Sequence, residues 1–263
     1  MRFSARDHAS MFNTLETWRQ RAGARLADQL WPPCCVICRR PGLDRLDLCA
    51  ACHAQLPSLT RKLGPDRYET LCEGCGRAGP GVGGEPCVDC RGRPPLFSRS
   101  LSLYRYEYPF DCLLHGVKYG RRREPCRVFG QLLAEAVTGD AERAGRLPEC
   151  LLPVPSTRRR LHERGFNPAE DIADWCGASL GVPVLARQVR RVEDGGALAG
   201  QARAERQLGI RGAFMAGNGV ADRHVAIIDD VLTSGATSGE LAREVLDSGA
   251  REVELWTLAR TEA

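Results

Sequence analysis

A strongly apolar stretch runs directly into two neighbouring carboxylates in the last sixth of the chain. Residues 225–228 are all apolar, and Asp229 and Asp230 follow at once. A continuous apolar run is typical of a strand that is buried on both faces of a parallel sheet. A short loop of hydroxyl and small residues comes next, and a helix is predicted to open at about Gly239. The loop residues that bear on chemistry are Thr233, Ser234, Gly235, Ala236 and Thr237.

This strand, loop and helix together predict a phosphate site. The start of a helix offers unpaired N–H groups and a partial positive charge, and Gly235 lets the backbone come close to a phosphate. The hydroxyls of Thr233, Ser234 and Thr237 can add hydrogen bonds to phosphate oxygens. The two acids lie one step earlier, where the hydroxyls of a sugar or a metal ion would lie. An ordinary strand–loop–helix turn with a capping threonine is the alternative interpretation, and the complete run in order favours the phosphate site.

The class of phosphate ligand follows from what the loop lacks. A P-loop requires a lysine after its second glycine, and none is present between residues 229 and 239. A dinucleotide site requires three spaced glycines, which are absent as well. The sequence therefore favours a sugar 5-phosphate over a nucleoside triphosphate.

A second kind of chemistry is carried by cysteines that form four Cys-x-x-Cys pairs. Ten residues separate the first two pairs and eleven separate the last two. Two such pairs across a short hairpin form a tetrahedral thiolate cage, so two structural zinc sites are predicted, with sequential rather than interleaved pairing. Four pairs in tandem argue against a thioredoxin-like redox motif, and iron stays an alternative metal. The predicted ligands are Cys35, Cys38, Cys49, Cys52, Cys72, Cys75, Cys87 and Cys90.

The five remaining cysteines are expected to be small, buried apolar residues. They are Cys34, Cys112, Cys126, Cys150 and Cys176.

Net charge and hydropathy exclude several classes of protein. The chain has 37 basic and 33 acidic residues, a formal charge of +4. Each zinc tetrathiolate carries about −2, so two of them bring the total close to zero. Nucleic-acid binding therefore cannot be argued from net charge. No apolar run is long enough for a membrane span, and the first residues are polar and charged without the apolar core of a secretory signal. We expect a cytoplasmic protein without a membrane span.

The elements that must position these residues fall into three parts. Residues 1–33 are predicted to hold an amphipathic helix, residues 34–95 a double zinc ribbon, and residues 96–263 an α/β domain with a parallel sheet. Residues 91–95 are expected to be the linker. In the α/β domain, strands are predicted at 101–106, 150–154, 225–228 and 253–258, and helices at 111–117, 126–138, 168–180 and 239–248.

Further polar residues follow the second of these strands. Ligands of an open parallel sheet bind beyond the carboxyl ends of its strands, so Ser156 and the three arginines Arg158, Arg159 and Arg160 are candidates for binding pyrophosphate. Asn167 is predicted to cap the next helix, with Arg164 close to that helix end. Lys118 is either a phosphate contact or plain surface. The run of arginines at 121–123 is expected to be a solvated face.

These motifs, in this order, resemble the ComF family of competence and DNA-uptake proteins. The resemblance runs from Trp31 to the C-terminus, and the segment at 225–237 is similar to the phosphoribosyl pyrophosphate (PRPP) motif of type I phosphoribosyltransferases. It implies a phosphoribosyltransferase-like α/β sheet flanked by helices and preceded by a small zinc-ribbon domain. It also implies PRPP or a related sugar phosphate as ligand, with Mg²⁺ as cofactor. Asp229 and Asp230 would hold the ribose hydroxyls, and residues 233–237 the 5-phosphate. Single-stranded DNA and other DNA-uptake proteins are the implied partners.

One segment departs from the family pattern. Between residues 190 and 214, Gly195, Leu198 and Gly209 stand where such proteins often carry Thr, Gln and Asn, whereas Arg206 is retained. The glycines still predict a flexible lid over the site. Two hypotheses follow: a phosphoribosyltransferase acting on a nucleobase or amine, or a non-catalytic zinc-stabilised scaffold that binds nucleic acid or senses a ligand.

Overall fold

The computed structural model divides the chain into two compact units, Met1–Ala54 and Gln55–Ala263. The predicted N-terminal helix and the predicted lid with Arg206 lie outside the described residues, and the domain limits at 33 and 95 stay a prediction. The structure describes residues 32–43, 46–59, 62–64, 67–68, 71–72, 74–77, 86–144, 146–192 and 212–261.

The first unit is organised around its cysteines. Isolated bridges pair Cys34 with Pro41 and Leu43 with Leu46, and the helix α2 (Ala50–Ala54) follows. Val36 N donates a hydrogen bond to Asp47 O at 2.9 Å, which brings the two cysteine-bearing turns together. Few large apolar side chains are available here, so the cysteines must supply the centre of this unit.

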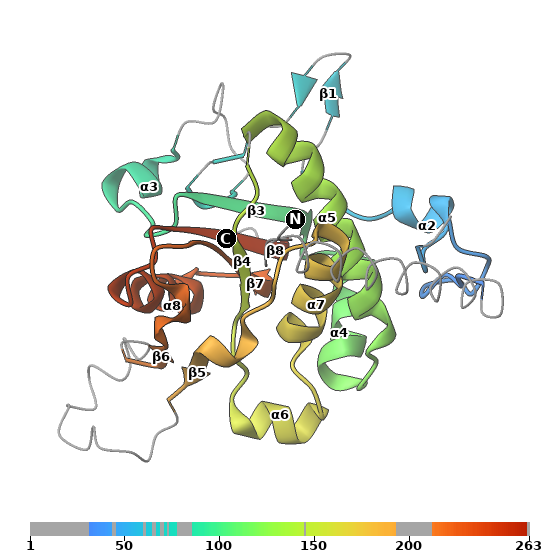
Figure 1. Cartoon of the computed structure of the whole chain (residues 1–263). Helices are drawn as coiled ribbons and strands as arrows, with labels where there is room; N and C mark the ends of the chain where they lie inside the picture. The colour runs from blue at the N-terminus through green and yellow to red at the C-terminus, as the bar shows by residue number, and fades with distance from the viewer. Residues whose placement is uncertain are drawn as a thin grey trace, which may run out of the picture. The chain divides into compact units, whose positions relative to one another are not determined.

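The second unit is built on a four-stranded parallel sheet with the order β3-β8-β7-β4 (Figure 1). Its strands are β3 (Arg99–Arg105), β4 (Cys150–Pro153), β7 (His224–Leu232) and β8 (Glu252–Arg260). All three pairings are parallel, so the carboxyl ends of the strands lie at one edge. All four predicted strands are confirmed, and so is the α/β fold with a parallel sheet flanked by helices.

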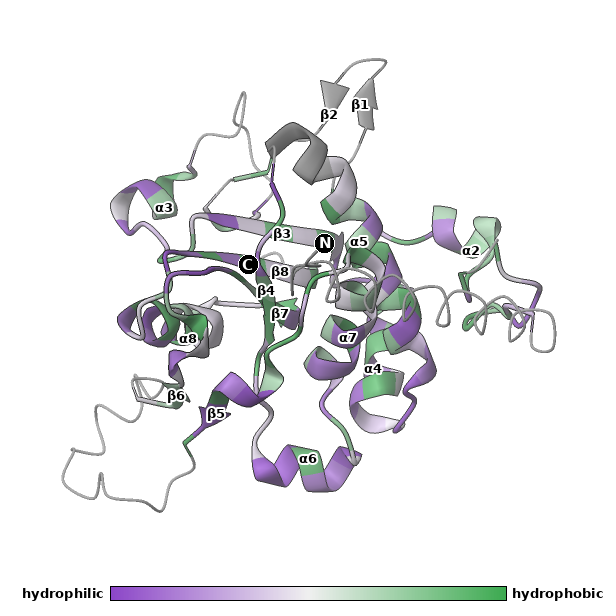
Figure 2. Ribbon diagram, viewed as in Figure 1, coloured by the Kyte–Doolittle hydropathy of each residue, from purple (hydrophilic) through white to green (hydrophobic). Residues whose placement is uncertain are grey.

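Helices cover both faces of the sheet, with α8 against one face and α5 and α7 against the other (Figure 1). The middle of β7 is hydrophobic, whereas most residues of α6 are hydrophilic (Figure 2). On the α8 side, Val225 and Ile227 pack with Leu241 and Val245 in a buried cluster. The helices of the unit are α3 (Val88–Gly92), α4 (Phe110–Tyr119), α5 (Glu124–Ala144), α6 (Arg158–Arg164), α7 (Pro168–Leu180) and α8 (Ala236–Asp247).

Several helices differ from the sequence prediction, and α5 extends six residues beyond the predicted end at 138. Helix α8 begins at Ala236, three residues earlier than predicted, because Gly235 takes a left-handed conformation with φ +75° and turns the chain at once. Residues 158–164 form α6 rather than a loop, since the Thr157 side chain accepts a hydrogen bond from Arg160 N. The predicted linker at 91–95 begins inside α3.

Small two-stranded pairs complete the second unit. One joins β1 (Lys62–Gly64) to β2 (Arg67–Tyr68), and the other joins β5 (Val189–Arg191) to β6 (Phe214–Ala216), both antiparallel. In the described part of the chain, the helices are all too short or too polar to cross a membrane.

The cysteines that were expected to be buried divide into two groups. Cys126, Cys150 and Cys176 are buried as predicted, whereas Cys34 and Cys112 are exposed. Cys112 points outward because the neighbouring Leu113 and Leu114 occupy the buried face of α4.

Candidate functional site

The two carboxylates lie at the carboxyl edge of the sheet, on the central strand β7. Alternate residues of a strand point to opposite faces, so Asp229 and Asp230 meet different neighbours. Asp229 accepts a hydrogen bond from the Ser238 hydroxyl in the first turn of α8. Asp230 forms an ion pair with Lys118 at the end of α4, with 2.9 Å between Nζ and Oδ1. The backbone N–H of Asp230 donates to Asp229 Oδ1 at 2.8 Å, which joins the two acids.

Burial and mutual repulsion make Asp229 unusually hard to ionise. Its pKa is raised from 3.8 to about 7, because burial and the charge of Asp230 both disfavour the carboxylate. The Asp230 N–H, the charge of Lys118 and the hydroxyl of Ser238 act in the opposite direction. A group that ionises near neutral pH, beside a second acid, is characteristic of a functional site.

Lys118 is a residue whose role the sequence left open, and plain surface is the wrong interpretation. Its side chain is 18% exposed and that of Asp230 16%, so the pair is largely withdrawn from water. The chain has 37 basic residues, of which only Lys62 and Lys118 are lysines. A compact ammonium suits a single carboxylate oxygen, whereas a guanidinium would span two. Lys118 thus places a positive charge within the predicted site.

The loop after β7 is compact and open to solvent. Thr233 and Ser234 are exposed, and Ala236 N lies 3.4 Å from the Ser234 hydroxyl. Thr237 is part of α8 rather than of the loop, so its backbone N–H belongs to the first turn. Amides of a first turn have no partner inside their own helix and point outward along its axis. The arrangement therefore offers a group of donors to an anion.

The loop after β4 reaches the same edge, because β4 pairs in parallel with β7 and Pro153 lies opposite Ile228. Ser156 lies three residues beyond this pairing, and its hydroxyl bonds to Asn167 Oδ1 at 2.9 Å. Asn167 is the N-cap residue of α7, as predicted, but its side chain makes no capping hydrogen bond. Its side-chain amide donates to Val154 O at 3.1 Å instead. Both polar atoms of the side chain are thus bonded to the loop after β4 and do not reach the helix amides.

The arginines near this edge are in different settings. Arg158 is exposed in the first turn of α6. Arg164 lies over the ring of Tyr119, with 5.8 Å between its Cζ and the ring centroid. Arg123 lies on a solvated face, as predicted, with 63% of its side chain exposed, and it makes two 2.7 Å hydrogen bonds to Asp171. Arg121 donates to Glu163 O at 3.1 Å. Arg121 and Arg123 thus tie the start of α5 to its neighbours.

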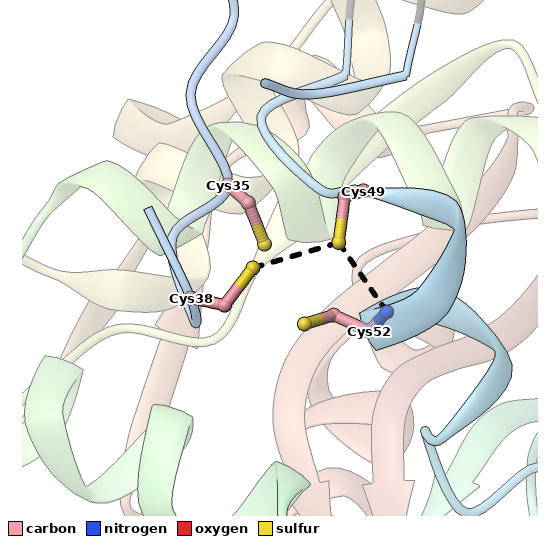
Figure 3. Close-up of side chains that lie close together, drawn as sticks. All are labelled: Cys35, Cys38, Cys49 and Cys52. Atoms are coloured by element: carbon pink, nitrogen blue, oxygen red, sulfur yellow. Dashed lines mark hydrogen bonds between the residues drawn. The ribbon is translucent and has the colours of Figure 1, made fainter. Parts of the chain in front are cut away.

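The first cysteine group brings four thiols around one centre (Figure 3). The Sγ atoms of Cys35, Cys38, Cys49 and Cys52 all lie within 4.8 Å of one another. Cys38 Sγ is 3.6 Å from Cys49 Sγ, and Cys52 N donates to Cys49 Sγ at 3.4 Å. Burial would raise the pKa of Cys35, but backbone and thiol hydrogen bonds outweigh it and lower the pKa to about 6. Four sulfur donors at this spacing fit a tetrahedral zinc ion.

The second group repeats this arrangement within the α/β unit. The thiols of Cys72, Cys75, Cys87 and Cys90 also lie within 4.8 Å of one another. Cys87 N donates to Cys72 Sγ at 3.2 Å, and Cys75 Sγ is 3.8 Å from Cys87 Sγ. Burial is outweighed again by hydrogen bonds, which lower the pKa of Cys72 to about 7. The sequential pairing of the cysteines is confirmed, and each group can hold one metal ion.

A third group of potential ligands lies at the opposite edge of the sheet and is already satisfied. Glu254 contacts His224 Nε2 at 3.0 Å, Arg99 Nη2 at 2.9 Å and Trp256 Nε1 at 2.8 Å. Burial opposes ionisation, but these three donors outweigh it and lower the pKa of Glu254 to about 2. Glu252 lies beside them and pairs with Arg146. Because cations already neutralise both acids, we interpret this group as a structural network.

Comparison with known proteins gives relatives that extend over nearly the whole chain. The DNA utilization protein YhgH of Salmonella typhimurium is 30% identical over 238 residues, which cover 88% of this chain and 98% of that protein. The YhgH protein of Escherichia coli K12 is 30% identical over 233 residues. Competence protein F of Haemophilus influenzae is 27% identical, over 86% of this chain and 96% of that one. No family model matches the chain.

Solved structures show a more distant likeness. An adenine phosphoribosyltransferase from Leishmania tarentolae is 16% identical, with a TM-score of 0.36 over 65% of this chain and 93% of that one. A glutamine PRPP amidotransferase from B. subtilis is 18% identical, with a TM-score of 0.37 over 51% of this chain and 26% of that one. TM-scores this low carry no weight, so the assignment rests on the sequence relatives. With 30% identity along almost its full length, the chain belongs to the ComF family, the family of YhgH and competence protein F.

Proposed function

We propose that this protein binds PRPP together with Mg²⁺ at the carboxyl edge of the sheet and acts in the uptake or use of external DNA. The observation that carries the proposal is the succession along β7 and α8. A half-buried acidic pair is followed by Gly235 at φ +75° and by the open first turn of α8. That order supplies acceptors for sugar hydroxyls and, next to them, donors for a phosphate.

Each group at this edge has a distinct part in such binding. Asp229 and Asp230 would accept hydrogen bonds from the ribose hydroxyls, and residues 233–237 would donate to the 5-phosphate. Ser156 and Arg158, on the β4 loop at the same edge, would bind the pyrophosphate, with Arg164 behind them. Mg²⁺ bound with PRPP would neutralise charge on the pyrophosphate. Lys118 would keep Asp230 paired until the sugar hydroxyls arrive.

We further propose that bound PRPP is turned over by pentosyl transfer. The bond between ribose C1 and the pyrophosphate oxygen would break, and the pyrophosphate would leave with the bonding electron pair. A nitrogen of the acceptor would bond to C1 and release its proton to water. The carboxylates of Asp229 and Asp230, fixed at the ribose, would favour the positive charge that develops on the ring. The exposed Arg158 would favour the charge on the leaving group.

The link to DNA comes from the relatives, which are named for DNA utilization and competence. A cytoplasmic location and contacts with other DNA-uptake proteins are part of the same proposal. The two cysteine groups support the location, because thiols that bind a metal must stay reduced and a reducing compartment keeps them so.

Calorimetric titration with PRPP and Mg²⁺ tests the proposed site. Wild type is expected to bind in the micromolar range, and the Asp229→Asn/Asp230→Asn double variant is expected to lose binding. Asp222→Asn is the matched control, because Asp222 is 93% exposed and lies before the start of β7, at the opposite end of the strand. Absence of binding by folded, zinc-loaded wild type would contradict the proposal, and so would equal binding by the double variant.

A second candidate function is favoured by one surface feature. Tyr119 is 69% exposed, its ring centroid lies 4.6 Å from that of His115, and Arg164 lies over its ring. Exposed aromatic rings with nearby cations are used to stack the bases of single strands. A non-catalytic scaffold would bind single-stranded DNA with strong salt dependence and would release no pyrophosphate from PRPP. Tyr119→Ala would weaken that binding, and measurable pyrophosphate release would favour the enzyme.

A further inference from the structure

Arg260 is a buried cation at the carboxyl end of the central strand β8. Only 5% of it is exposed, and one guanidinium nitrogen, Nη1, donates to the carbonyl of Cys75. Its Nε has no hydrogen-bond partner among the described residues. No carboxylate in that part of the chain forms an ion pair with it. A buried guanidinium without a counter-charge is costly, so the surroundings of Arg260 must supply one.

The second cysteine group lies beside Arg260, because the carbonyl of its Cys75 accepts the hydrogen bond from Arg260 Nη1. Burial lowers the pKa of Arg260 most, and the neighbouring Arg77 lowers it as well. The groups that raise its pKa are the thiols of Cys75, Cys90 and Cys72. Four thiolates around one zinc ion retain a net charge of about −2, which would balance these two arginines.

We propose that the metal-loaded second cysteine group is the counter-ion of Arg260. Through Arg260, this group fixes the end of β7, from which the loop that begins at Thr233 departs. Zinc bound there would be part of the core of the α/β unit, not only the centre of a separate ribbon. Arg260 is accordingly a positioning residue, since it would act through the backbone at the ends of β7 and β8.

The connection from Arg260 to the loop is short. Arg260 lies opposite Leu232 in the parallel pairing of β8 with β7. The next residue, Thr261, donates from its N–H to Leu232 O at 3.1 Å. Leu232 is followed directly by Thr233, the first loop residue, and its Cδ1 lies 3.6 Å from where a Cβ on Gly235 would be. A displaced Arg260 would therefore disturb the backbone from which the loop departs.

The turn that carries Cys75 is also pressed against the edge strand β3. A Cβ on Gly76 would lie only 3.2 Å from Ser100 Oγ and 3.5 Å from Ser102 Oγ, and Gly76 has φ +65°. Ser100 is buried, and its hydroxyl has no hydrogen-bond partner among the described residues. The second cysteine group is thus packed against both β3 and β8.

The first cysteine group provides an internal control, because it belongs to the other compact unit. Cys87→Ser and Cys49→Ser each remove one ligand of intermediate exposure from one group. Both variants are expected to hold one zinc less than wild type by elemental analysis. Hydrogen exchange of residues 232–238, measured without PRPP, is expected to be at least ten-fold faster in Cys87→Ser and within two-fold of wild type in Cys49→Ser.

Variants of Arg260 test whether the effect of zinc on the loop passes through this residue. In an Arg260→Gln background, Cys87→Ser is expected to have a much smaller additional effect on loop exchange, whereas Arg260→Lys restores the dependence on zinc. If Cys87→Ser unfolds the α/β unit while Cys49→Ser stays folded, the proposal is supported. In that case, chelator-induced unfolding compared between wild type and Arg260→Gln replaces the exchange measurement. Equal loop exchange in the two cysteine variants would overturn the proposal. The proposal would also be overturned if zinc loss accelerated loop exchange as much in Arg260→Gln as in wild type. None of these readouts requires PRPP to bind.

Discussion

Lys118 and Asp230 lie 2.9 Å apart across the carboxyl edge of the sheet, and they come from opposite ends of the α/β unit's sequence. The lysine lies in the last turn of α4, and the aspartate lies in β7 two residues after its buried run 224–228. Their pairing holds one positive charge beside two adjacent acids. That charge also favours ionisation of Asp229, because it lowers the pKa that burial and the charge of Asp230 raise.

Lys118→Met is expected to shift the pH dependence of PRPP binding. Loss of the ammonium removes a charge that lowers the pKa of Asp229, so that pKa rises further and fewer molecules carry both carboxylates at pH 7. Calorimetric binding should weaken about ten-fold at pH 7 and recover in part at pH 8.5. Lys62→Met, at the other lysine, should leave the pH profile unchanged. An unaltered profile in Lys118→Met would show that the ion pair has no influence on ligand binding.

Asp229→Asn is expected to stabilise the ligand-free protein at alkaline pH. The folded pKa of about 7 exceeds the unfolded value of 3.8, so the wild type loses stability as pH rises from about 4 to about 7. Asparagine cannot ionise and escapes this loss. Each pH unit between the two pKa values corresponds to about 1.4 kcal/mol, and we expect a gain of about 1–3 kcal/mol at pH 8 that vanishes near pH 4. Urea denaturation at the two pH values measures it, and a variant less stable than wild type at pH 8 would contradict the raised pKa.

Two glycines near the start of α8 give a matched pair with opposite outcomes. Gly235 has φ +75°, so Gly235→Ala should cost about 1–2 kcal/mol of unfolding free energy and weaken PRPP binding. Gly239 lies inside α8, and a methyl group added there would meet nothing within 4 Å, so Gly239→Ala should add about 0.5–1 kcal/mol. Thermal unfolding and calorimetry on both variants test this. Stabilisation by both substitutions would contradict the left-handed turn.

The buried network around Glu254 is expected to contribute to stability and not to ligand binding. Glu254→Gln leaves Arg99 and His224 without their carboxylate partner and should cost about 2–4 kcal/mol of unfolding free energy. Since the folded pKa is about 2, below the unfolded value of 4.5, this contribution is present above pH 4.5 and is lost toward pH 2. Glu163→Gln, in an exposed ion pair with Arg159, should leave the denaturation midpoint unchanged. Loss of PRPP affinity in folded Glu254→Gln would assign this network to the site instead.

The fold was predictable where a single physical pattern decides the outcome. The apolar run at 225–228 is typical of a strand inside a parallel sheet, and the cysteine spacing is typical of two thiolate cages. The antiparallel pair of β5 with β6 was not predicted. Each of its strands has three residues, too few for alternation to be read.

Sequence could predict which consecutive residues form the candidate site, but not the contacts that distant residues make with them. Asp229, Asp230 and the loop are consecutive, so their proximity follows from covalent connection. Lys118 reaches Asp230 only through the packing of α4, and no periodicity at residue 118 indicates that partner. The side chain of Asn167 was misjudged for the same reason, since its contact with the β4 loop competes with helix capping in a way that sequence alone does not show.

The strand order β3-β8-β7-β4 sets the timing of folding during synthesis. The two edge strands are made first, and the two central strands that join them are the last two in chain order. Arg99 pairs with Glu254 in the register of β3 and β8. More than half of the chain must therefore be synthesised between β3 and the strand with which it pairs. A nascent chain interrupted before β8 would carry exposed edges with no partner between them, a state prone to aggregation and degradation. The cysteines of the first unit precede all of this, so that unit can take up its metal while the remainder is still being translated.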